Sequence, residues 1–311
     1  MSFRILRSGF LLTIQDGGRF GLAHYGVSQS GVADEQAAYW ANHLLGNHFN
    51  DAVIEITLGD FECIALDETD IVITGADLDF TLNDKSITMW QENHIVKGDK
   101  IRCATAKKGQ GVRAYIAVKG GFKTPNLFNS RSVNLREHIG QPLQQDDVLT
   151  STRSEPKPIK RSTPLFLRPN YSEPLILRFL ASYQYADFTQ TQINTFLNQS
   201  YLIQSTSDRT GYRLEGKAIA DVASKMISEG IAYGSIEITT AGQPIILLKD
   251  RPTIGGYPKI GTVFSLDLAK LAQRQPGCEV IFKSMDLEVA QQLRQQFNAF
   301  FGIKQSTLNL N

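Results

Sequence analysis

Cysteine and long apolar runs are scarce in this chain of 311 residues. The three cysteines, Cys63, Cys103 and Cys278, lie too far apart for a C-x-x-C metal site or a disulfide framework. No run of about 18 apolar residues occurs, so the sequence predicts no membrane-spanning helix. Residues 1–12 lack the apolar centre of a signal peptide. Together these features predict a protein of the reducing cytoplasm.

A surplus of charge of one sign is also missing. Lys and Arg number 32 and Asp and Glu 31, which gives a formal net charge of +1. A dedicated nucleic-acid binder usually carries a basic excess, so that class is disfavoured. Hydrophobic residues make up 42% of the chain, whereas a disordered protein combines low hydrophobicity with high net charge. We therefore expect a folded protein with a large core.

Two familiar catalytic motifs, the Walker A loop and the G-x-S-x-G elbow, are absent. Residues 109–114 match the dinucleotide pattern G-x-G-x-x-A by letter, but they lead into a strand pattern, so we expect a hairpin turn. His43 and His48 are five positions apart and do not share a helix face, which argues against a metal pair. His24 lies in a glycine-rich loop and is the histidine that we take as an acid–base candidate.

Short apolar and β-branched segments dominate the chain, and they end near Gly, Pro, Asp or Asn. We predict strands at 61–66, 71–74, 100–103, 112–118, 175–179, 201–204, 235–238, 245–248 and 262–266. Helices are predicted at 34–45, 188–197, 267–274 and 287–301, the last with Asp286 as its N-cap and an apolar stripe that docks on the barrel or on a partner. The pattern predicts a mainly β fold with a few peripheral helices, and it favours a barrel or a sandwich over a parallel α/β sheet.

Prolines gather between residues 151 and 174, where they block regular structure and suit a connection between lobes. The predicted organisation has four parts. They are an N-terminal β-rich lobe (1–155), a proline-rich connection (156–174), a C-terminal barrel lobe (175–285), and a C-terminal helix with a tail (286–311).

Three segments combine glycine with charged residues: 15–34, 207–216 and 250–261. Glycine lets the backbone approach a ligand closely, and arginine donates forked hydrogen bonds to carboxylates or phosphates. Lysine or tyrosine beside them can donate to a developing negative oxygen. The alternative for each segment is a tight turn tied by a local Asp–Arg ion pair.

Together these segments resemble the allophanate hydrolase subunit 2 family, also called biotin-dependent carboxyltransferase-like. Its Q-D-x-G-R-x-G and A-N-x-L-x-G-N patterns match residues 15–21 and 41–47, and its S-D-R-M-G-x-R-L-x-G and D-x-x-T-x-G-G-Y-x-K patterns match 207–216 and 250–259. Thr210 replaces the methionine of the third pattern, and Glu237 stands where the family usually has glutamine. In the family's G-S-R-S-T segment, Asn129 and Val133 replace glycine and threonine.

The resemblance, strongest to the C-type subunits of 5-oxoprolinase, implies a cyclophilin-like β-barrel. It also implies a component of an ATP-dependent 5-oxoprolinase, which opens 5-oxoproline to L-glutamate. The implied partners are a B-type subunit, which is an allophanate hydrolase subunit 1-like protein, and a separate A-type subunit of 5-oxoprolinase. ATP with Mg²⁺ is then expected on the assembled complex, and no metal site is expected in this chain.

Two other interpretations stay open at this point. One is a carboxyltransferase subunit of a biotin-dependent system, in which biotin is the cofactor. The other is a non-catalytic regulatory binding protein, like the sporulation-kinase-inhibitor antagonist of the same family. The chain lacks the A-M-K-M signature of a biotin carrier, so we do not expect a complete urea carboxylase.

The candidate site residues come from the three segments. We expect proton transfer or donation to substrate from four catalytic candidates: Asp250, Tyr257, Lys259 and His24. We expect binding or orientation of anionic groups from a second set: Arg19, Asp16, Asp208, Arg209, Arg213, Arg251, Gly255 and Gly256.

Overall fold

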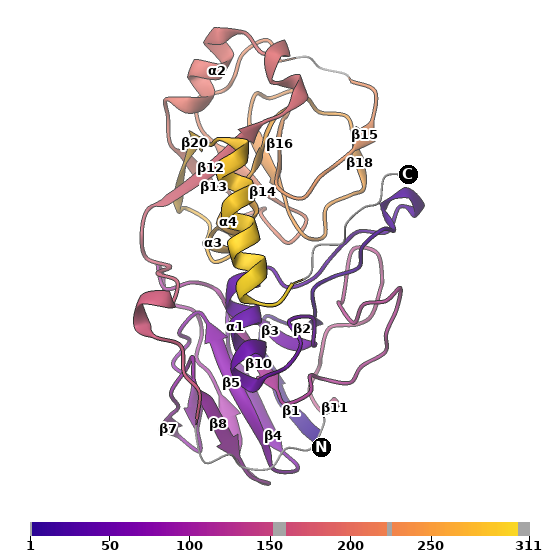
Figure 1. Ribbon diagram of the computed structural model, residues 1–311, viewed down its shortest axis with the longest axis vertical. Coiled ribbons are helices and arrows are strands. Elements are labelled where there is room, and N and C mark those ends of the chain that lie inside the picture. Colours follow the sequence, from indigo (N-terminus) through magenta and orange to yellow (C-terminus); the bar gives the residue numbers. More distant parts are fainter. Residues whose placement is uncertain (1, 152–159, 223–225, 304–311) are drawn as a thin grey trace.

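A computed structural model describes residues 2–151, 160–222 and 226–303. Two β-rich halves are stacked along its long axis, with the N-terminal half at the bottom of Figure 1 and the C-terminal half at the top. Residues 152–159 and 304–311, which include Pro156, Pro158 and the end of the predicted tail, lie outside the described residues.

Two antiparallel sheets build the N-terminal half. In spatial order, the six-stranded sheet contains β11 (Val148–Thr150), β1 (Ser2–Ser8), β4 (Phe61–Ala65), β9 (Lys100–Arg102), β6 (Thr81–Leu82) and β7 (Lys85–Ser86). The five-stranded sheet contains β2 (Leu11–Gln15), β3 (Val53–Thr57), β10 (Arg113–Val118), β5 (Thr69–Gly75) and β8 (Glu92–Ile95).

The five-stranded sheet is buried on both faces. Side chains of a strand point alternately to the two sides of a sheet, so neighbouring residues of one strand join different cores. In β3, Ile54 and Ile56 join the core between the two sheets. Val53 faces the other way and packs with residues of α1 (Glu35–Leu45). Glu55 has the same parity as Val53, so a carboxylate is buried on the helix side of the sheet.

Helix α1 begins and ends at positions that the sequence marks. The Asp34 carboxylate caps its start by accepting from the Ala37 N–H at 3.0 Å. Gly46 ends it with a φ of 65°, a conformation that glycine adopts without a Cβ clash. The helix covers the five-stranded sheet on the side that faces the C-terminal half (Figure 1).

The C-terminal half is a closed seven-stranded barrel. Around the barrel its strands are β12 (Leu175–Ala181), β19 (Lys259–Val263), β16 (Ser235–Ile238), β17 (Pro244–Leu247), β14 (Gly211–Glu215), β13 (Tyr201–Ile203) and β20 (Glu279–Ser284). The parallel pair β12–β20 closes it. A separate two-stranded ribbon joins β15 (Glu229–Gly230) to β18 (Ile254–Gly255).

Short helices surround the barrel: α2 (Gln190–Leu197), α3 (Ser265–Leu271) and the 3-10 turn η3 (Tyr183–Asp187). Two further 3-10 turns, η1 (Ala23–Tyr25) and η2 (Leu165–Leu167), lie in loops. Between the halves, residues 160–174 run beside the N-terminal half, where the Thr163 N–H donates to the Trp90 carbonyl at 2.9 Å.

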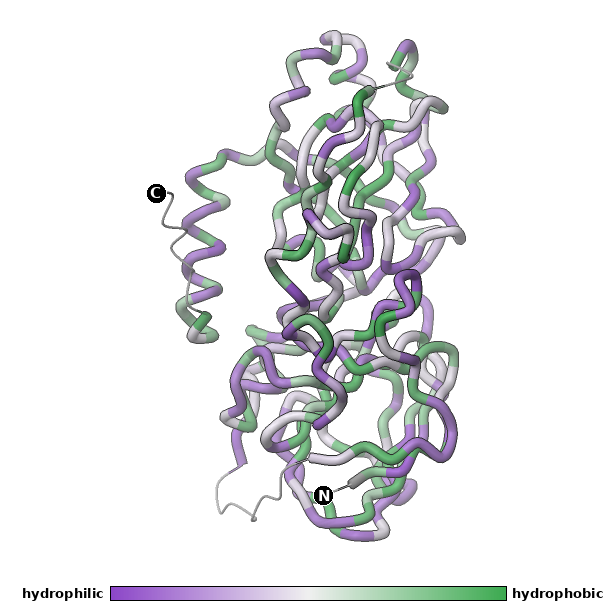
Figure 2. Tube along the Cα trace, turned by 90° about the vertical axis from the view of Figure 1, so that its right-hand side faces the viewer, coloured by the Kyte–Doolittle hydropathy of each residue, from purple (hydrophilic) through white to green (hydrophobic). Residues whose placement is uncertain are grey.

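Helix α4 (Leu287–Phe300) runs alongside the barrel to the junction with the N-terminal half (Figures 1 and 2). The Asp286 carboxylate caps its start. Arg294 donates to Glu35 of α1 at 2.8 Å, and Phe297 packs against Tyr39 of the same helix. Glu35 also accepts from Lys249, whose side chain is buried, at 2.7 Å. The helix therefore fastens the two halves together.

The predicted fold class is confirmed, and the strand at 235–238 has the predicted bounds. The strand predicted at 262–266 is shifted, because Lys259–Val263 pairs with both neighbouring strands while Ser265 begins α3. The predicted hairpin at 109–114 is wrong. Lys108 and Gly109 lie in a turn, but β9 before it and β10 after it belong to different sheets.

The predicted apolar stripe of α4 is only partly covered, since Val289 and Phe300 are about half exposed. Across the described residues, no helix is long and apolar enough to cross a bilayer.

Candidate functional site at the junction of the two halves

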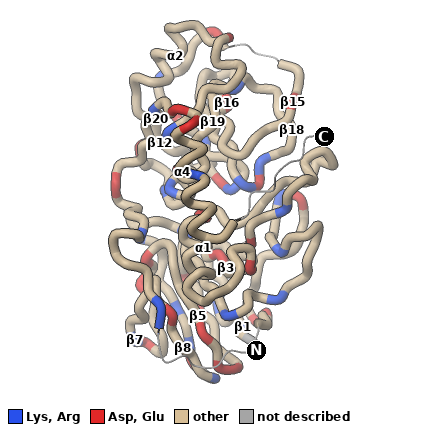
Figure 3. Tube along the Cα trace, viewed as in Figure 1, with Lys and Arg blue, Asp and Glu red and all other residues tan. Residues whose placement is uncertain are grey.

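All three glycine-rich segments contribute to the junction of the halves. The Ser30 N–H donates at 2.9 Å to the carbonyl of Lys249, the residue before the third segment, and the Asp250 N–H donates to the Arg209 carbonyl at 2.9 Å. The Arg209 guanidinium donates to the Gly31 carbonyl at 2.8 Å, which brings the second segment to the first. Basic and acidic positions are interleaved along this junction (Figure 3).

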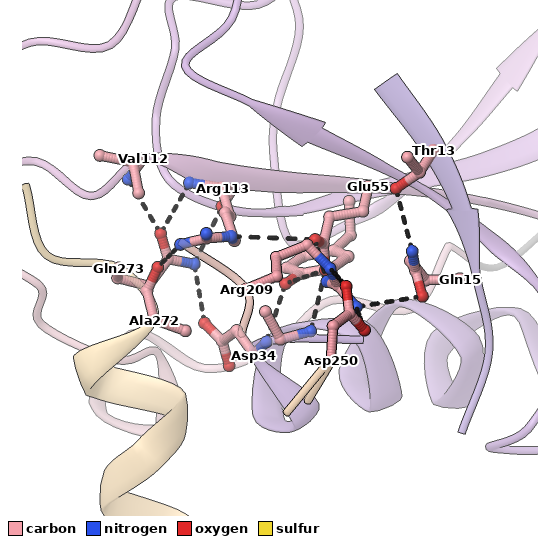
Figure 4. A network of polar contacts seen from close by, with 12 residues as sticks. Thr13, Gln15, Asp34, Glu55, Val112, Arg113, Arg209, Asp250, Ala272 and Gln273 are labelled. Atoms are coloured by element: carbon pink, nitrogen blue, oxygen red, sulfur yellow. Dashed lines mark hydrogen bonds and ion pairs between the residues drawn. The ribbon is translucent and has the colours of Figure 1, made fainter. Parts of the chain in front are cut away.

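Arg209 is the centre of a buried ion network (Figure 4). Its Nε donates to Asp250 Oδ2 at 2.8 Å, and its Nη1 donates to Glu55 Oε1 at 2.7 Å. Its Nη2 contacts Gly31 and also Gln15 Oε1, at 3.4 Å. Every guanidinium nitrogen thus has a protein acceptor, and the acceptors come from both halves.

The network continues along the helix-side face of the five-stranded sheet (Figure 4). Tyr115 donates to Glu55 Oε2 at 2.9 Å, and Arg113 donates to the Tyr212 hydroxyl at 3.1 Å. Gln273, from the C-terminal half, donates to Asp34 Oδ2 at 2.8 Å. These contacts tie the start of α1 to the barrel.

Electrostatic pairing keeps Glu55 and Arg209 charged. Burial alone would raise the pKa of Glu55, but Arg209 and Arg113 lower it. The pKa of Arg209 is raised by Asp250 and Glu55 in spite of its burial. The enclosed space beside the network is about 10 Å³, room for at most one water. Arg209 therefore ties the barrel to the N-terminal half, and Asp250, from the same half as Arg209, holds its guanidinium in place.

A larger cavity of about 210 Å³ lies beside this network. One wall is the N-terminal loop from Arg19 to Gln29, and the other is formed by Ile231 and by residues 251–253 of the C-terminal half. Ser28 lies between the walls, with its hydroxyl oxygen 2.6 Å from the Arg251 carbonyl oxygen. We call this space the junction cavity.

Arg19 lines the junction cavity and is only 2% exposed. Its Nη2 donates to the Ser132 carbonyl. Its Nε and Nη1 are buried and have no hydrogen-bond partner within the described part of the chain. Burial lowers the pKa of Arg19, and the nearby carboxylates of Asp16, Asp250 and Glu137 oppose that shift.

Arg251 supplies a second guanidinium to the cavity wall. It donates to the carbonyls of Ile231 and Leu248, at 3.1 and 3.2 Å, and to the Gln29 side chain at 3.4 Å. All three acceptors are neutral. Burial lowers the pKa of Arg251.

Lys259 belongs to a different cluster, at the edge of the barrel. Its Nζ donates to Glu229 Oε1 at 2.5 Å, and Tyr183 donates to the other oxygen of that carboxylate. The hydrogen bond from Lys259 is the main reason that the pKa of Glu229 is lowered. Glu237 stands directly opposite Lys259 in the β16–β19 ladder.

Glu237 is a buried carboxyl group whose Oε1 has no partner among the described residues. Burial raises its pKa, and Lys259 opposes this. Gly255 of the ribbon approaches it closely: a Cβ there would lie 2.9 Å from Glu237 Oε1 and 2.5 Å from Ile231 Cδ1. Ile231 lines the junction cavity and lies against the same glycine, so the cluster of Lys259, Glu229 and Glu237 adjoins the wall of that cavity.

The remaining predicted residues lie outside both clusters. Asp208 is a turn residue whose carboxylate accepts from the Thr210 N–H at 2.7 Å. Arg213 is exposed on β14. His24 is exposed in η1, and its ring lies tilted against that of Tyr25, with ring centres 3.9 Å apart. Gly256 and the partly exposed Tyr257 follow the ribbon.

Several members of these clusters were not among the predicted site residues. Glu55 interrupts the apolar segment V-I-E-I-T, and a carboxylate inside a buried strand signals a buried partner. Arg113 and Tyr115 lie in a predicted strand, and their role depends on which face they occupy. Glu237 was visible as a departure from the family pattern. Glu229 lies in the sequence S-E-G at residues 228–230, which matches a further pattern of the same family, but it was not taken as a site residue.

The described residues contain no group of three or more His, Cys, Asp or Glu side chains arranged to hold a metal ion. The donor set at the junction consists of Arg209, which is fully paired within the protein, and of Arg19 and Arg251 beside a cavity of about 210 Å³. It does not resemble a nucleotide site, which needs a phosphate-binding loop and a Mg²⁺-binding carboxylate.

Comparisons with known proteins agree with each other. Residues 25–284 match the family model for the carboxyltransferase domain, subdomain A and B. The chain is 35% identical over 293 residues to the C-type 5-oxoprolinase subunit of Haemophilus influenzae, and the match covers 91% of each chain. It is 31% identical over 308 residues to the C-type 5-oxoprolinase subunit of Escherichia coli, with 96% of each covered.

A solved structure gives the same architecture. The crystal structure of Kluyveromyces lactis urea carboxylase matches with a TM-score of 0.84 and 25% sequence identity. That match covers 100% of this chain and 30% of the urea carboxylase chain.

Proposed function

Because the chain belongs to the carboxyltransferase domain family, subdomain A and B, we propose that it is the C-type component of an ATP-dependent 5-oxoprolinase. Such a complex opens the lactam ring of 5-oxoproline to L-glutamate. The observation that carries the proposal is the extent of the matches. They span 91% and 96% of the two C-type 5-oxoprolinase subunits, but only 30% of the urea carboxylase chain.

The proposal includes a B-type partner and a separate A-type partner. Large apolar side chains near the junction cavity support a partner there: Phe20 is 71% exposed, Tyr25 74% and Ile254 62%. Phe20 lines the cavity, and Ile254 follows the cavity residue Thr253. Exposed apolar surface of this kind is typical of interaction sites. A partner seated there would close the cavity from solvent.

Ring opening adds the oxygen of water to the lactam carbonyl, breaks the carbon–nitrogen bond and delivers a proton to the leaving nitrogen. Glu237 suits this proton transfer, because its burial favours the protonated carboxyl. Lys259 stands opposite it, and Tyr257 is on the adjoining loop. We assign ATP and Mg²⁺ to the assembled complex and derive no step through them in this chain.

Reconstitution tests the proposal. The chain is combined with its B-type and A-type partners, supplied with 5-oxoproline and ATP-Mg²⁺, and glutamate and ADP are quantified with each component omitted in turn. Glutamate formed only when this chain is present supports the proposal. A folded, assembled complex that makes no glutamate contradicts it.

A substitution tests whether the reaction depends on a residue of this chain. In the active complex, Lys259→Ala is expected to lower kcat about 10²- to 10⁴-fold, the usual contribution of a group that takes part in proton transfer. Lys283→Ala, which changes an exposed lysine of β20, is the matched control. Full activity of Lys259→Ala would remove Lys259 from the mechanism.

A biotin-linked carboxyltransferase is the second candidate, and the structural match to urea carboxylase favours it. In that case the complex would transfer a carboxyl group from carboxybiotin to an amide nitrogen. Incubation with carboxylated biotin carrier and labelled urea distinguishes the two functions, because only the carboxyltransferase gives a carboxylated urea product.

A further inference from the structure

Arg19 is a buried cation for which the protein supplies too few acceptors. Two of its guanidinium nitrogens have no partner among the described residues. A buried polar group without a hydrogen bond is costly, and a charged one more so. Such a group is retained where something outside the chain satisfies it.

The nearby carboxylates do not satisfy Arg19, because other donors occupy them. Glu137 accepts from the backbone and side chain of Ser28. Asp250 is paired with Arg209. The carboxylate of Asp16 accepts from four donors: the N–H groups of Gly18 and Arg131 and the hydroxyls of Ser130 and Ser132.

The junction cavity that Arg19 lines has the size of a small metabolite site. Its volume of about 210 Å³ is below the roughly 300–1,000 Å³ typical of pockets for drug-sized ligands. Arg251 on the opposite wall adds a second positive charge whose acceptors are neutral. The cavity therefore combines a positive potential with little space, which favours a compact anion.

We propose that the junction cavity binds the carboxylate of a small organic acid, with the Arg19 guanidinium as its counter-charge. The inference rests on the proposed function only for the identity of that acid, since 5-oxoproline carries one carboxylate on its lactam ring. The carboxylate replaces the missing acceptors of Arg19, and charged hydrogen bonds of this kind are the strong ones in proteins.

Calorimetric titration of the full chain tests this with two matched probes. 5-Oxoproline and 2-pyrrolidinone share the lactam ring, but only the former has a carboxylate. We expect 5-oxoproline to bind more tightly than 2-pyrrolidinone by about 10- to 150-fold, the range for a hydrogen bond to a charged group. Arg19→Gln should lose that advantage, and Arg19→Lys should keep part of it.

Arg102→Gln is the matched control, because Arg102 is an exposed arginine paired with Asp84 on the outer sheet. It should bind both probes as the wild type does. Equal binding of the two probes overturns the inference, as does unchanged binding by a folded Arg19→Gln. Tighter binding of inorganic phosphate than of 5-oxoproline overturns the carboxylate assignment.

The assembled complex provides a second readout. There, Arg19→Gln should raise the KM for 5-oxoproline more than it lowers kcat. A complex that makes glutamate with an unchanged KM in Arg19→Gln overturns the inference and leaves the proposed function standing. If the complex makes no glutamate, but the chain binds acetate through Arg19, the proposed function fails and the carboxylate site stands.

Discussion

Two buried arginines at the junction show how differently the same residue type is used. Arg209 donates to two carboxylates and a carbonyl, and the space beside it is about 10 Å³. Arg19 has two nitrogens without a partner among the described residues, and it lines a cavity of about 210 Å³. The difference lies in the acceptors that the fold provides. Where they are complete, the charge fastens the halves, and where they are incomplete, the charge is available to a ligand.

Removal of Arg209 should have the largest effect on stability. Arg209→Met leaves Asp250 without its ion-pair partner and Glu55 with Arg113 alone, and breaking comparable buried pairs costs about 3–5 kcal/mol. Urea unfolding at pH 7 measures this. Arg19→Gln should change the free energy of unfolding by much less, because no ion pair is broken. Equal losses in the two variants would contradict the distinction between the two regions.

Glu35 is another buried charge at the junction, and its contribution to the free energy of unfolding depends on pH. Burial would raise its pKa, but Lys249 and Arg294 lower it from 4.5 to about 2. Its stabilising contribution is therefore present above about pH 4.5 and is lost as the pH falls toward 2. Glu35→Gln should cost about 1–3 kcal/mol at pH 7 by leaving Lys249 without its counter-charge.

Denaturant unfolding between pH 7 and pH 3 checks the Glu35 prediction. The variant should show a shallower loss of stability below about pH 4.5 than the wild type, since it lacks the titrating carboxylate. Parallel profiles for the two proteins would show that Glu35 does not carry the effect. Glu288→Gln, at an exposed glutamate of α4, is the control.

The close packing of the ribbon between the cavity and the Lys259 cluster can be tested by a substitution at Gly255. A Cβ there would lie 2.5 Å from Ile231 and 2.9 Å from Glu237, so Gly255→Ala must displace the ribbon. Overpacking of this kind costs about 1–3 kcal/mol. In the complex we expect kcat to fall while the affinity for 5-oxoproline changes little. Gly230→Ala, where a Cβ meets nothing within 4 Å, is the control. Equal activity of both variants would contradict a role for close ribbon packing.

The sequence predicted the fold class and the family, and both are confirmed. Periodicity was enough for helix α1, because its apolar stripe is bracketed by Asp34 and Gly46. It was not enough at residues 262–266, where an apolar run is compatible with both a strand and a helix start. Strand pairing on both sides of β19 decided that case.

The candidate site was less accessible to sequence reasoning. The motifs brought attention to Arg19, Arg209 and Arg251, but they do not say which guanidinium finds its acceptors within the protein. That depends on Glu55 and Ser132, which reach the junction only through sheet pairing and the fold of a distant loop. Assigning roles to the arginines therefore requires the three-dimensional arrangement.

A substitution of Glu137 tests the comparison of Arg19 with Arg209 most specifically, and its expected effect is the smallest. Its carboxylate opposes the lowering of the Arg19 pKa and accepts from Ser28, which lines the cavity. Glu137→Gln keeps an acceptor for Ser28 and removes the negative charge. Because the Glu137 side chain is 17% exposed, we expect a gain of only about 1 kcal/mol or less, roughly up to fivefold tighter binding of 5-oxoproline.

The Glu137 effect should depend on Arg19 and on salt. In an Arg19→Gln background, Glu137→Gln should give a smaller gain, because the charge that it unmasks is gone. Raising the ionic strength should shrink the gain, since the cavity communicates with exposed loop residues. The same variant should leave 2-pyrrolidinone binding unchanged, because that ligand carries no charge. Weaker 5-oxoproline binding in Glu137→Gln would mean that Glu137 holds the ligand rather than opposing it, and the division between a closed ion network and an open anion cavity would then be wrong.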